Sequence, residues 1–172
     1  MSRSHAHIVT QISSVASVGE KWLTETFFPA LSITFPHARL ANVVPAPKPK
    51  QSIIFPTAAE IRNSIDGYSS GGSIHMKSAT AVQQRQVDFI RPMLCHWSPQ
   101  PPNSERAVKQ GNPHRHPAAP HIKTYVRFKD TNMQEIEWAM LTSANLSTQA
   151  WGREYFLLRI CVSPSDLKLP RI

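Results

Sequence analysis

Three side chains in this sequence have the chemistry that hydrolysis of a phosphodiester requires when neither a metal ion nor another cofactor takes part. His121 and Lys123 lie two residues apart in a His-Ile-Lys tripeptide, and Asn145 follows within Thr-Ser-Ala-Asn. An imidazole can attack phosphorus or protonate a leaving oxygen near neutral pH. An ammonium group supplies a point charge, and a carboxamide supplies oriented hydrogen bonds, to the same phosphate. These residues indicate phosphoryl transfer.

The segments around these residues predict two β-strands. Residues 121–128 alternate between a basic face and an apolar face, and we expect the apolar face to be buried. On this pattern His121 and Lys123 share one face of the strand. Residues 136–142 form a second β-rich run that ends just before Asn145, in a position where loops of α/β folds gather ligand-binding residues. Taken alone, the short tripeptide also fits a chance match on an exposed strand.

Longer stretches of the chain resemble the tyrosyl-DNA phosphodiesterase family of the phospholipase D superfamily. An HxK tripeptide followed by Ser-x-Asn is the half-signature of that superfamily. The resemblance runs in order from about residue 8 to residue 152, through segments 13–19, 21–23, 54–57, 67–73, 121–125 and 142–152. Phe128 stands where the superfamily usually has an aspartate, and this particular family shares that departure.

The resemblance implies a two-step hydrolysis of 3′-phosphotyrosyl and related 3′-blocked DNA ends. In the family one histidine attacks phosphorus to form a phosphohistidine, and a second histidine protonates the leaving group and then activates water. Carried over to this chain, His121 is the expected general acid/base. Lys123 is the expected phosphate clamp, and Asn145 the expected donor to the phosphate or to the histidine.

The resemblance also implies a DNA partner. Ser14, Ser17 and Ser73 match serines that contact the DNA backbone in the family. The resemblance therefore implies that the chain binds single-stranded or duplex 3′ ends, including ends with topoisomerase-derived adducts. It also implies a role in DNA repair and a nuclear location. A net charge of +8 and an isoelectric point near 9.9 fit a polyanionic partner. Two cysteines indicate a reducing compartment, and no apolar run approaches the ~20 residues of a membrane span.

The family's active site is bilobal, and this chain is expected to hold only the second half. Upstream, we consider only His5-Ala6-His7 as an approximation of the first HxK motif, and it has no lysine. Beyond Gly152 the match weakens, and Ser163–Asp166 replaces an expected acidic residue. We therefore interpret the chain as a fragment that is inactive by itself. The alternative is a non-catalytic remnant that binds nucleic acid.

We expect an α/β fold with a mixed sheet flanked by helices, in a single partial domain covering residues 1–172. Residues 19–31, 57–65 and 79–97 have helical patterns, with Pro92 shortening the last helix, and residues 6–14 and 52–55 are expected strands. Residues 98–120 form a proline- and histidine-rich loop, and residues 153–172 a divergent tail. Cys95, His96, His114, His116 and His121 fit no standard zinc spacing, so no metal is expected. An incomplete sheet edge predicts dimerisation.

Overall fold

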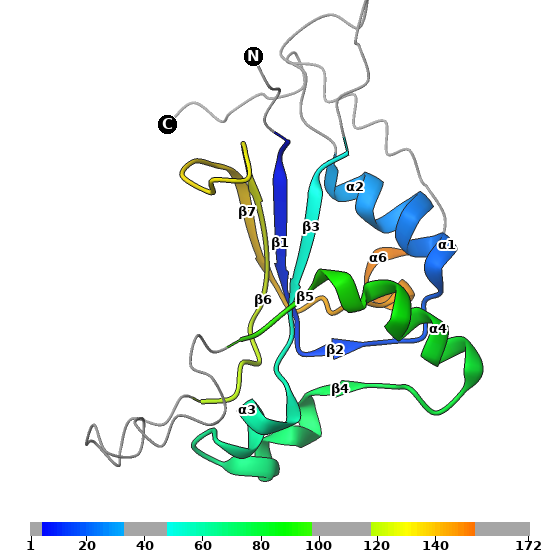
Figure 1. The fold of residues 1–172 in the computed structure, drawn as a ribbon, viewed down its shortest axis with the longest axis vertical. Helices are drawn as coiled ribbons and strands as arrows, with labels where there is room; N and C mark the ends of the chain where they lie inside the picture. The colour runs from blue at the N-terminus through cyan, green and yellow to red at the C-terminus, as the bar shows by residue number, and fades with distance from the viewer. Residues whose placement is uncertain (1–4, 33–47, 98–117, 154–172) are drawn as a thin grey trace, which may run out of the picture.

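A mixed sheet of five strands organises the structure, a computed structural model that describes residues 5–32, 48–97 and 118–153. Its order is β5-β3-β1-β6-β7 (Figure 1). The strands are β1 (His7–Gln11), β3 (Lys50–Ile54), β5 (Leu94–Cys95), β6 (Lys123–Phe128) and β7 (Ile136–Thr142). β3 pairs in parallel with both β1 and β5, whereas β6 is antiparallel to β1 and to β7. The expected mixed sheet is confirmed.

Short elements connect and cover this sheet. A small parallel ribbon joins β2 (Ser14–Val15) to β4 (His75–Met76). The first helical segment comprises α1 (Glu20–Trp22), a π-helical turn (Leu23–Phe27) and α2 (Phe28–Ser32). The others are α3 (Ala58–Arg62), a 3₁₀ helix (Gly67–Ser73), α4 (Ala81–Ile90), a second 3₁₀ helix (Arg91–Met93) and α6 (Thr148–Trp151).

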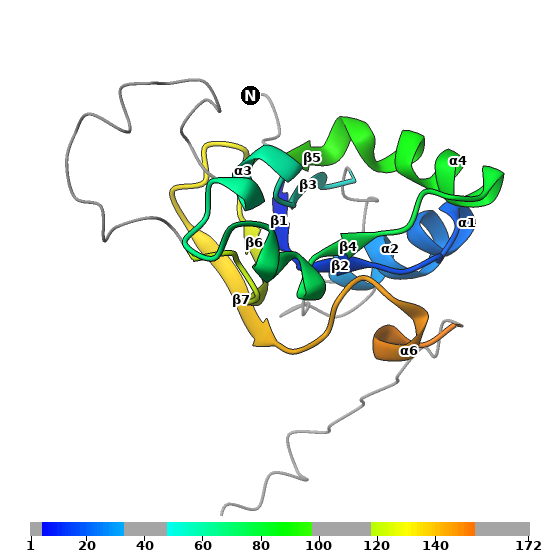
Figure 2. The ribbon, with the colours of Figure 1, turned by 90° about the horizontal axis from the view of Figure 1, so that it is seen from below.

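The hydrophobic core lies between the sheet and helices α1, α2, α4 and α6, which gather on one side of it (Figure 2). Aromatic rings fill the centre. Phe27 stacks on Trp22 at 5.3 Å between ring centroids, and Trp151 meets Tyr125 edge-on at 5.0 Å. The indole N–H of Trp22 also donates to the carbonyl of Gly152 at 2.8 Å, which ties α1 to the end of α6.

Several element boundaries differ from the sequence prediction. The expected strand over residues 6–14 is divided, because β1 ends at Gln11 and the chain turns before β2. The expected helix over residues 79–97 ends at Ile90, since Pro92 allows only a 3₁₀ turn, and β5 follows it. The capping box predicted at Thr57 and Glu60 is confirmed, with bonds of 2.7 and 3.2 Å between side chains and backbone.

The predicted burial of the two faces of β6 is wrong. Lys123, Tyr125 and Arg127 form the buried face, with 4%, 0% and 6% of their surfaces exposed. The reason is that this face meets the helical layer, where Tyr125 anchors the aromatic core. Arg127 bonds Glu137 at 2.6 Å and the carbonyl of Ser32 at 3.3 Å, which compensates its burial.

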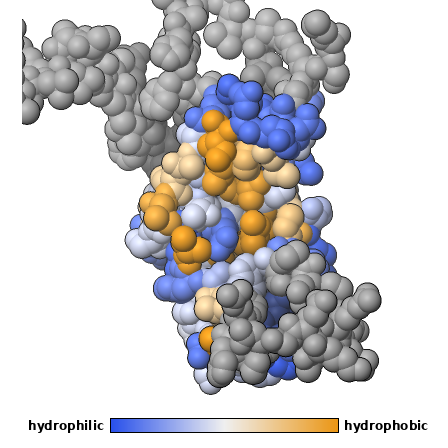
Figure 3. All heavy atoms as spheres, turned by 90° about the vertical axis from the view of Figure 1, so that its left-hand side faces the viewer, coloured by the Kyte–Doolittle hydropathy of each residue, from blue (hydrophilic) through white to orange (hydrophobic). Residues whose placement is uncertain are grey.

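The opposite side of the sheet carries exposed apolar side chains. Ile136 and Leu141 of β7 are 58% and 72% exposed, and Ile122 before β6 is 48% exposed. Figure 3, which views the side on which β7 lies, has an apolar area within a hydrophilic rim. β7 is also the last strand at its edge of the described sheet.

Some sequence predictions concern segments outside the described residues. These are most of the 98–120 loop, including His114 and His116, and the 153–172 tail beyond residue 153. Within the described part of the chain, none of the helices has the length and apolar character that crossing a bilayer requires.

Candidate functional site

The turn that follows β7 holds Asn145 in place through bonds from three directions. Thr142 begins the turn, and its hydroxyl accepts from the backbone N–H of Ala144 at 3.1 Å. The hydroxyl of Tyr125 donates to the carbonyl of Ala144 at 2.8 Å, and the indole of Trp151 donates to the carbonyl of Asn145 at 3.0 Å. Because Tyr125 is fully buried, its pKa is raised by desolvation, so the phenol keeps its proton for this bond.

The side chain of Asn145 has one oriented end and one available end. Its Oδ1 accepts from the backbone N–H groups of Ser13 and Ser14, at 3.0 Å each, and from the hydroxyl of Ser13 at 3.3 Å. Backbone N–H groups can only donate, so the oxygen must face them and the orientation of the amide is determined. Among the described residues the Nδ2 amide has no hydrogen-bond acceptor. It is therefore available to donate to a ligand.

Lys123 lies at the start of β6, directly opposite Thr142 of β7 in the strand register. Its Nζ donates to the carbonyl of His121 at 2.5 Å, and only 4% of the residue is exposed. Burial lowers the pKa of this amine, because the charged form loses hydration. Among the described residues no carboxylate pairs with Lys123, so the site contains a buried cation without a counter-ion.

The structure places His121 differently from the sequence prediction. His121 precedes β6, whose pairing begins at Lys123, and its side chain is exposed. A physical reason is Pro120, which directly precedes His121 and has no N–H to donate to a neighbouring strand, so strand pairing does not begin earlier. The contact between the two residues joins the amine of Lys123 to the backbone of His121, not to its imidazole.

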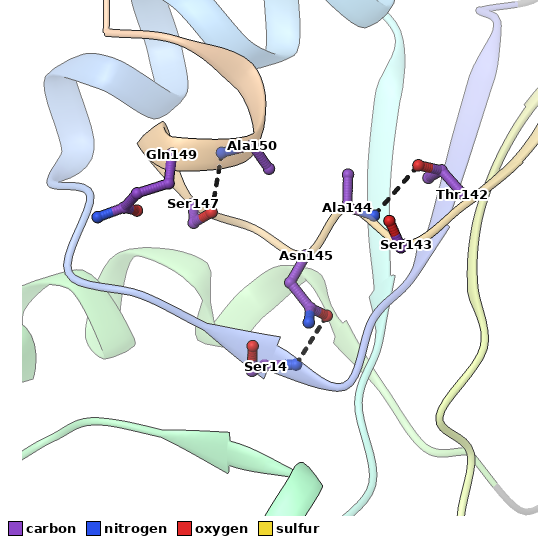
Figure 4. Close-up of a pocket in the computed structure, with 8 residues that line it drawn as sticks. All are labelled: Ser14, Thr142, Ser143, Ala144, Asn145, Ser147, Gln149 and Ala150. Atoms are coloured by element: carbon purple, nitrogen blue, oxygen red, sulfur yellow. Dashed lines mark hydrogen bonds between the residues drawn. The ribbon is translucent and has the colours of Figure 1, made fainter.

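An open hollow of about 570 Å³ surrounds the Asn145 turn. Its lining consists of short hydroxyl, amide and methyl side chains: Ser14, Thr142, Ser143, Ala144, Asn145, Ser147, Gln149 and Ala150. In Figure 4 Asn145 reaches down to the backbone of Ser14, and Ser147 and Gln149 lie above it on the same turn and on α6. These groups are neutral hydrogen-bonding groups suited to phosphate oxygens. His121 and Lys123 do not line this hollow.

The three serines expected to contact DNA lie on two adjoining segments. Ser14 belongs to β2 and lines the hollow, and the hydroxyl of Ser17 accepts from Gln83 at 2.9 Å. Ser73 ends the 3₁₀ helix, and its hydroxyl donates to the carbonyl of Ser70 at 3.3 Å. The ribbon pairs Ser14 with His75, so the chain just after Ser73 runs beside β2.

Sequence reasoning missed one pair of residues beside this site. His75-Met76-Lys77 also has HxK spacing, so the expectation that the chain has no earlier HxK tripeptide is wrong. It comes just after segment 67–73 of the family resemblance, its first two residues form β4, and His75 pairs with Ser14. The spacing itself was the signal in the sequence.

His7, by contrast, lies away from the site. It begins β1, whereas Asn145 bonds the backbone just beyond the other end of that strand. The four residue steps of β1 alone separate the two ends of that strand by roughly 13 Å. His7 is buried, and its Nε2 bonds the hydroxyl of Ser52 at 2.8 Å. The described residues contain no group of three or more His, Cys, Asp or Glu side chains that could hold a metal ion.

Comparison with known proteins identifies relatives over most of the chain. A family model described as tyrosyl-DNA phosphodiesterase matches residues 1–156. Tyrosyl-DNA phosphodiesterase 1 of Arabidopsis thaliana is 32% identical over 145 residues, which cover 84% of this chain and 20% of that protein. A probable tyrosyl-DNA phosphodiesterase of Caenorhabditis elegans is 32% identical over 152 residues, or 86% of this chain and 28% of that protein.

A solved structure has the same fold. The crystal structure of yeast tyrosyl-DNA phosphodiesterase matches with a TM-score of 0.56 and 23% identity, over 87% of this chain and 36% of that chain. The present chain thus spans only about a fifth to just over a quarter of the two curated relatives described above.

Proposed function

Because this chain belongs to the tyrosyl-DNA phosphodiesterase family, we propose that it forms part of a DNA-repair phosphodiesterase acting on 3′-phosphotyrosyl and related 3′-blocked ends. The proposed contribution of this chain is the second half-site. The observation that carries the proposal is the buried amine of Lys123, which has no carboxylate partner among the described residues. Lys123 begins β6, which pairs with β7, and the turn after β7 presents the free Nδ2 group of Asn145. A buried cation without a counter-ion favours binding of an anion.

The proposed reaction needs a nucleophilic histidine from outside this chain. That histidine would attack phosphorus and form a P–N bond, while the bond from phosphorus to the tyrosyl oxygen breaks. His121 would donate a proton to the leaving oxygen. It would then accept a proton from water as the water attacks phosphorus, which breaks the P–N bond and leaves a 3′-phosphate. Lys123 and Asn145 would stabilise the charge on the phosphate oxygens.

The alternative function is binding of nucleic acid without turnover. It is favoured by the exposed position of His121, whose side chain makes no hydrogen bond to Asn145 among the described residues. Both functions require an anion site at Lys123 and Asn145. They differ in whether a phosphodiester bond is cleaved once a nucleophile is supplied.

Binding of a 3′-phosphorylated oligonucleotide, compared with the same oligonucleotide ending in a 3′-hydroxyl, tests the proposed site. We expect the terminal phosphate to strengthen binding in EDTA, and Lys123→Ala and Asn145→Ala each to remove about tenfold of that gain. Lys129→Ala, an exposed cation at the turn between β6 and β7, is the matched control. Equal affinity for the two oligonucleotides would overturn the proposed site.

Turnover separates the two functions. We expect no cleavage of a 3′-phosphotyrosyl oligonucleotide by the chain alone, because we propose that the nucleophilic histidine comes from outside this chain. Metal-independent cleavage that His121→Ala abolishes would contradict that expectation and would favour a complete enzyme.

The remaining properties are also proposals. We propose that the chain acts in the nucleus as one partial domain with a divergent tail, and that it pairs with a second copy through the open edge of β7. The exposed Leu141 on that strand supports pairing. Imaging of a fluorescent fusion tests the location. Sedimentation at several concentrations tests the dimer, and a constant monomer mass would exclude it.

A further inference from the structure

We propose that His75 and Lys77 form a second anion-binding surface, which holds internucleotide phosphates of the strand whose 3′ end lies at Asn145. This inference rests on the proposed function, because it assigns a path to the substrate that the function requires. It concerns a different part of the substrate from the terminal phosphate, and can therefore fail separately.

Three chain segments lie side by side at this place. β2 is in the middle, with β4 on one side and the turn after β7 on the other (Figures 1 and 2). On the first side the N–H of His75 donates to the carbonyl of Ser13 at 3.1 Å. On the second side the N–H of Ala16 donates to the carbonyl of Leu146 at 2.9 Å, and that of Leu146 to the carbonyl of Ser14 at 3.3 Å. This hydrogen-bonded arrangement fixes the spacing of the three segments.

Alternation along these segments divides apolar from polar side chains. Val15 and Leu146 are buried in the hydrophobic core, and Met76 packs against it. Val15 is the register partner of Met76, and Ser14 that of His75. Successive side chains of extended chain point to opposite faces, so Ser14 and His75 face away from the core.

Lys77 continues the polar side. It lies two residues after His75, which places both on the same face where the chain stays extended. Both residues are exposed, and among the described residues neither side chain has a hydrogen-bond or ion-pair partner. The polar row therefore runs from Asn145 through Ser14 to His75 and ends at a free ammonium group.

The length of this row matches a chain of phosphates rather than one phosphate. The side chain of Asn145 already reaches β2, so its amide lies about one strand spacing, roughly 5 Å, from the backbone of His75. Lys77 lies two residues further along, which adds roughly 7 Å where the chain stays extended. A row of this length offers donors to consecutive phosphates of one strand, and the net charge of +8 favours such a polyanion.

Salt-dependent binding of a single-stranded dodecanucleotide with a 3′-hydroxyl tests this surface, because that ligand has only internucleotide phosphates. We expect Lys77→Ala to weaken binding of the full chain about fivefold to tenfold at low salt. We also expect the slope of log affinity against log salt to become shallower by about 0.7, the value for one lost contact on a single strand. Adding His75→Ala to Lys77→Ala is expected to weaken binding further, whereas Lys77→Arg alone should retain the affinity of the unaltered chain.

Lys50→Ala is the matched control, since it removes one exposed cation at the far end of the sheet. Circular dichroism of each variant checks the fold. If Lys77→Ala and Lys50→Ala bind the dodecanucleotide equally well, the inference is overturned. The proposed function would still stand if the terminal phosphate strengthens binding through Lys123 and Asn145. Failure of the unaltered chain to bind this ligand at low salt would also overturn the inference.

Discussion

Asn145 joins the turn after β7 to Ser14 of β2, because its Oδ1 accepts the backbone N–H of Ser14 at 3.0 Å. The same oxygen accepts the N–H of Ser13, so one amide side chain fastens two segments that are 131 and 132 residues apart in sequence. The carbonyl half of the amide thus has a structural function, and the NH₂ half remains for a ligand. The two functions can be separated by substitution.

Asn145→Asp should preserve the fold and weaken the binding of a phosphate. A carboxylate accepts the same backbone N–H groups, but it has no donor and repels a phosphate. We expect thermal stability close to that of the unaltered chain and a loss of at least about tenfold in affinity for a 3′-phosphorylated oligonucleotide.

Asn145→Ala is the matched comparison for the first prediction. It removes the acceptor as well, which leaves donors of Ser13 and Ser14 without partners and should cost about 1–3 kcal/mol in unfolding free energy. If the aspartate variant is as unstable as the alanine variant, the side-chain carbonyl of Asn145 does not stabilise the fold by accepting the N–H groups of Ser13 and Ser14.

Lys123→Met should stabilise the chain and weaken anion binding at the same time. The amine is buried, its pKa is lowered by desolvation, and its bond goes to a neutral carbonyl of His121. Methionine keeps much of the volume and removes the cost of burying the charge. Denaturant unfolding should report a gain of about 0.5–2 kcal/mol. Phosphate should raise the melting temperature of the unaltered chain more than that of the variant, and equal shifts would contradict this.

Gln86 should stabilise the loop that carries Ser17, because its side chain bonds the backbone on both sides of that residue. It is 3% exposed, and its amide receives the N–H groups of Val18 and Gly19, at 2.8 and 3.2 Å, and donates to Ala16 at 2.8 Å. Gln86→Leu leaves these backbone groups unsatisfied and should lower the unfolding free energy by roughly 2–4 kcal/mol.

Gln84→Leu, an exposed neighbour on α4, is the control for this substitution and should change stability by less than about 0.5 kcal/mol. Similar losses in the two variants would show that the effect arises from the helix and not from the loop. Denaturant titration of both variants provides the measurement.

Local signals predicted the elements that local chemistry determines. The capping box at Thr57 and Glu60 is encoded within four residues, and the end of α4 follows from Pro92. The strand expected over residues 136–142 has the bounds of β7, because its residues favour extended backbone and its partner β6 directly precedes it in sequence. The family resemblance extended this to the mixed sheet and to the candidate residues His121, Lys123 and Asn145.

Long-range packing decided what the sequence pattern could not. Alternation correctly grouped Lys123 with Arg127, but burial of that basic face depends on distant partners such as Ser32 and the aromatic core. The link between Asn145 and Ser14 has no local signature either. β2 and β4 have two residues each, too few for a periodic pattern, so the neighbourhood of His75 emerged only from the structure.

His7 should make the stability of the chain sensitive to acid. Its ring is buried, Nε2 bonds the hydroxyl of Ser52 at 2.8 Å, and Nδ1 is buried without a hydrogen-bond partner among the residues that the structure describes. Burial, followed by the charge of Lys50, lowers the pKa of His7 below the ordinary value of 6.5. The folded state therefore binds a proton less readily than the unfolded state does.

The direction of the pH dependence follows from this difference. Above the unfolded pKa of about 6.5, His7 is neutral in both states and its contribution to stability is fully present. As the pH falls below that value, the unfolded chain takes up the proton first, and unfolding becomes more favourable. The loss continues until the pH has passed the lowered pKa of the folded state, with a slope of at most about 1.4 kcal/mol per pH unit.

His7→Gln isolates the contribution of this residue from that of the other histidines. Glutamine can bond Ser52 but does not titrate, so the variant should lose less stability than the unaltered chain between neutral and mildly acidic pH. Urea unfolding across that range measures the difference. His5→Gln, an exposed histidine two residues earlier, should leave the pH profile unchanged. Parallel profiles for the unaltered chain and His7→Gln would mean that His7 binds protons equally in the folded and unfolded states.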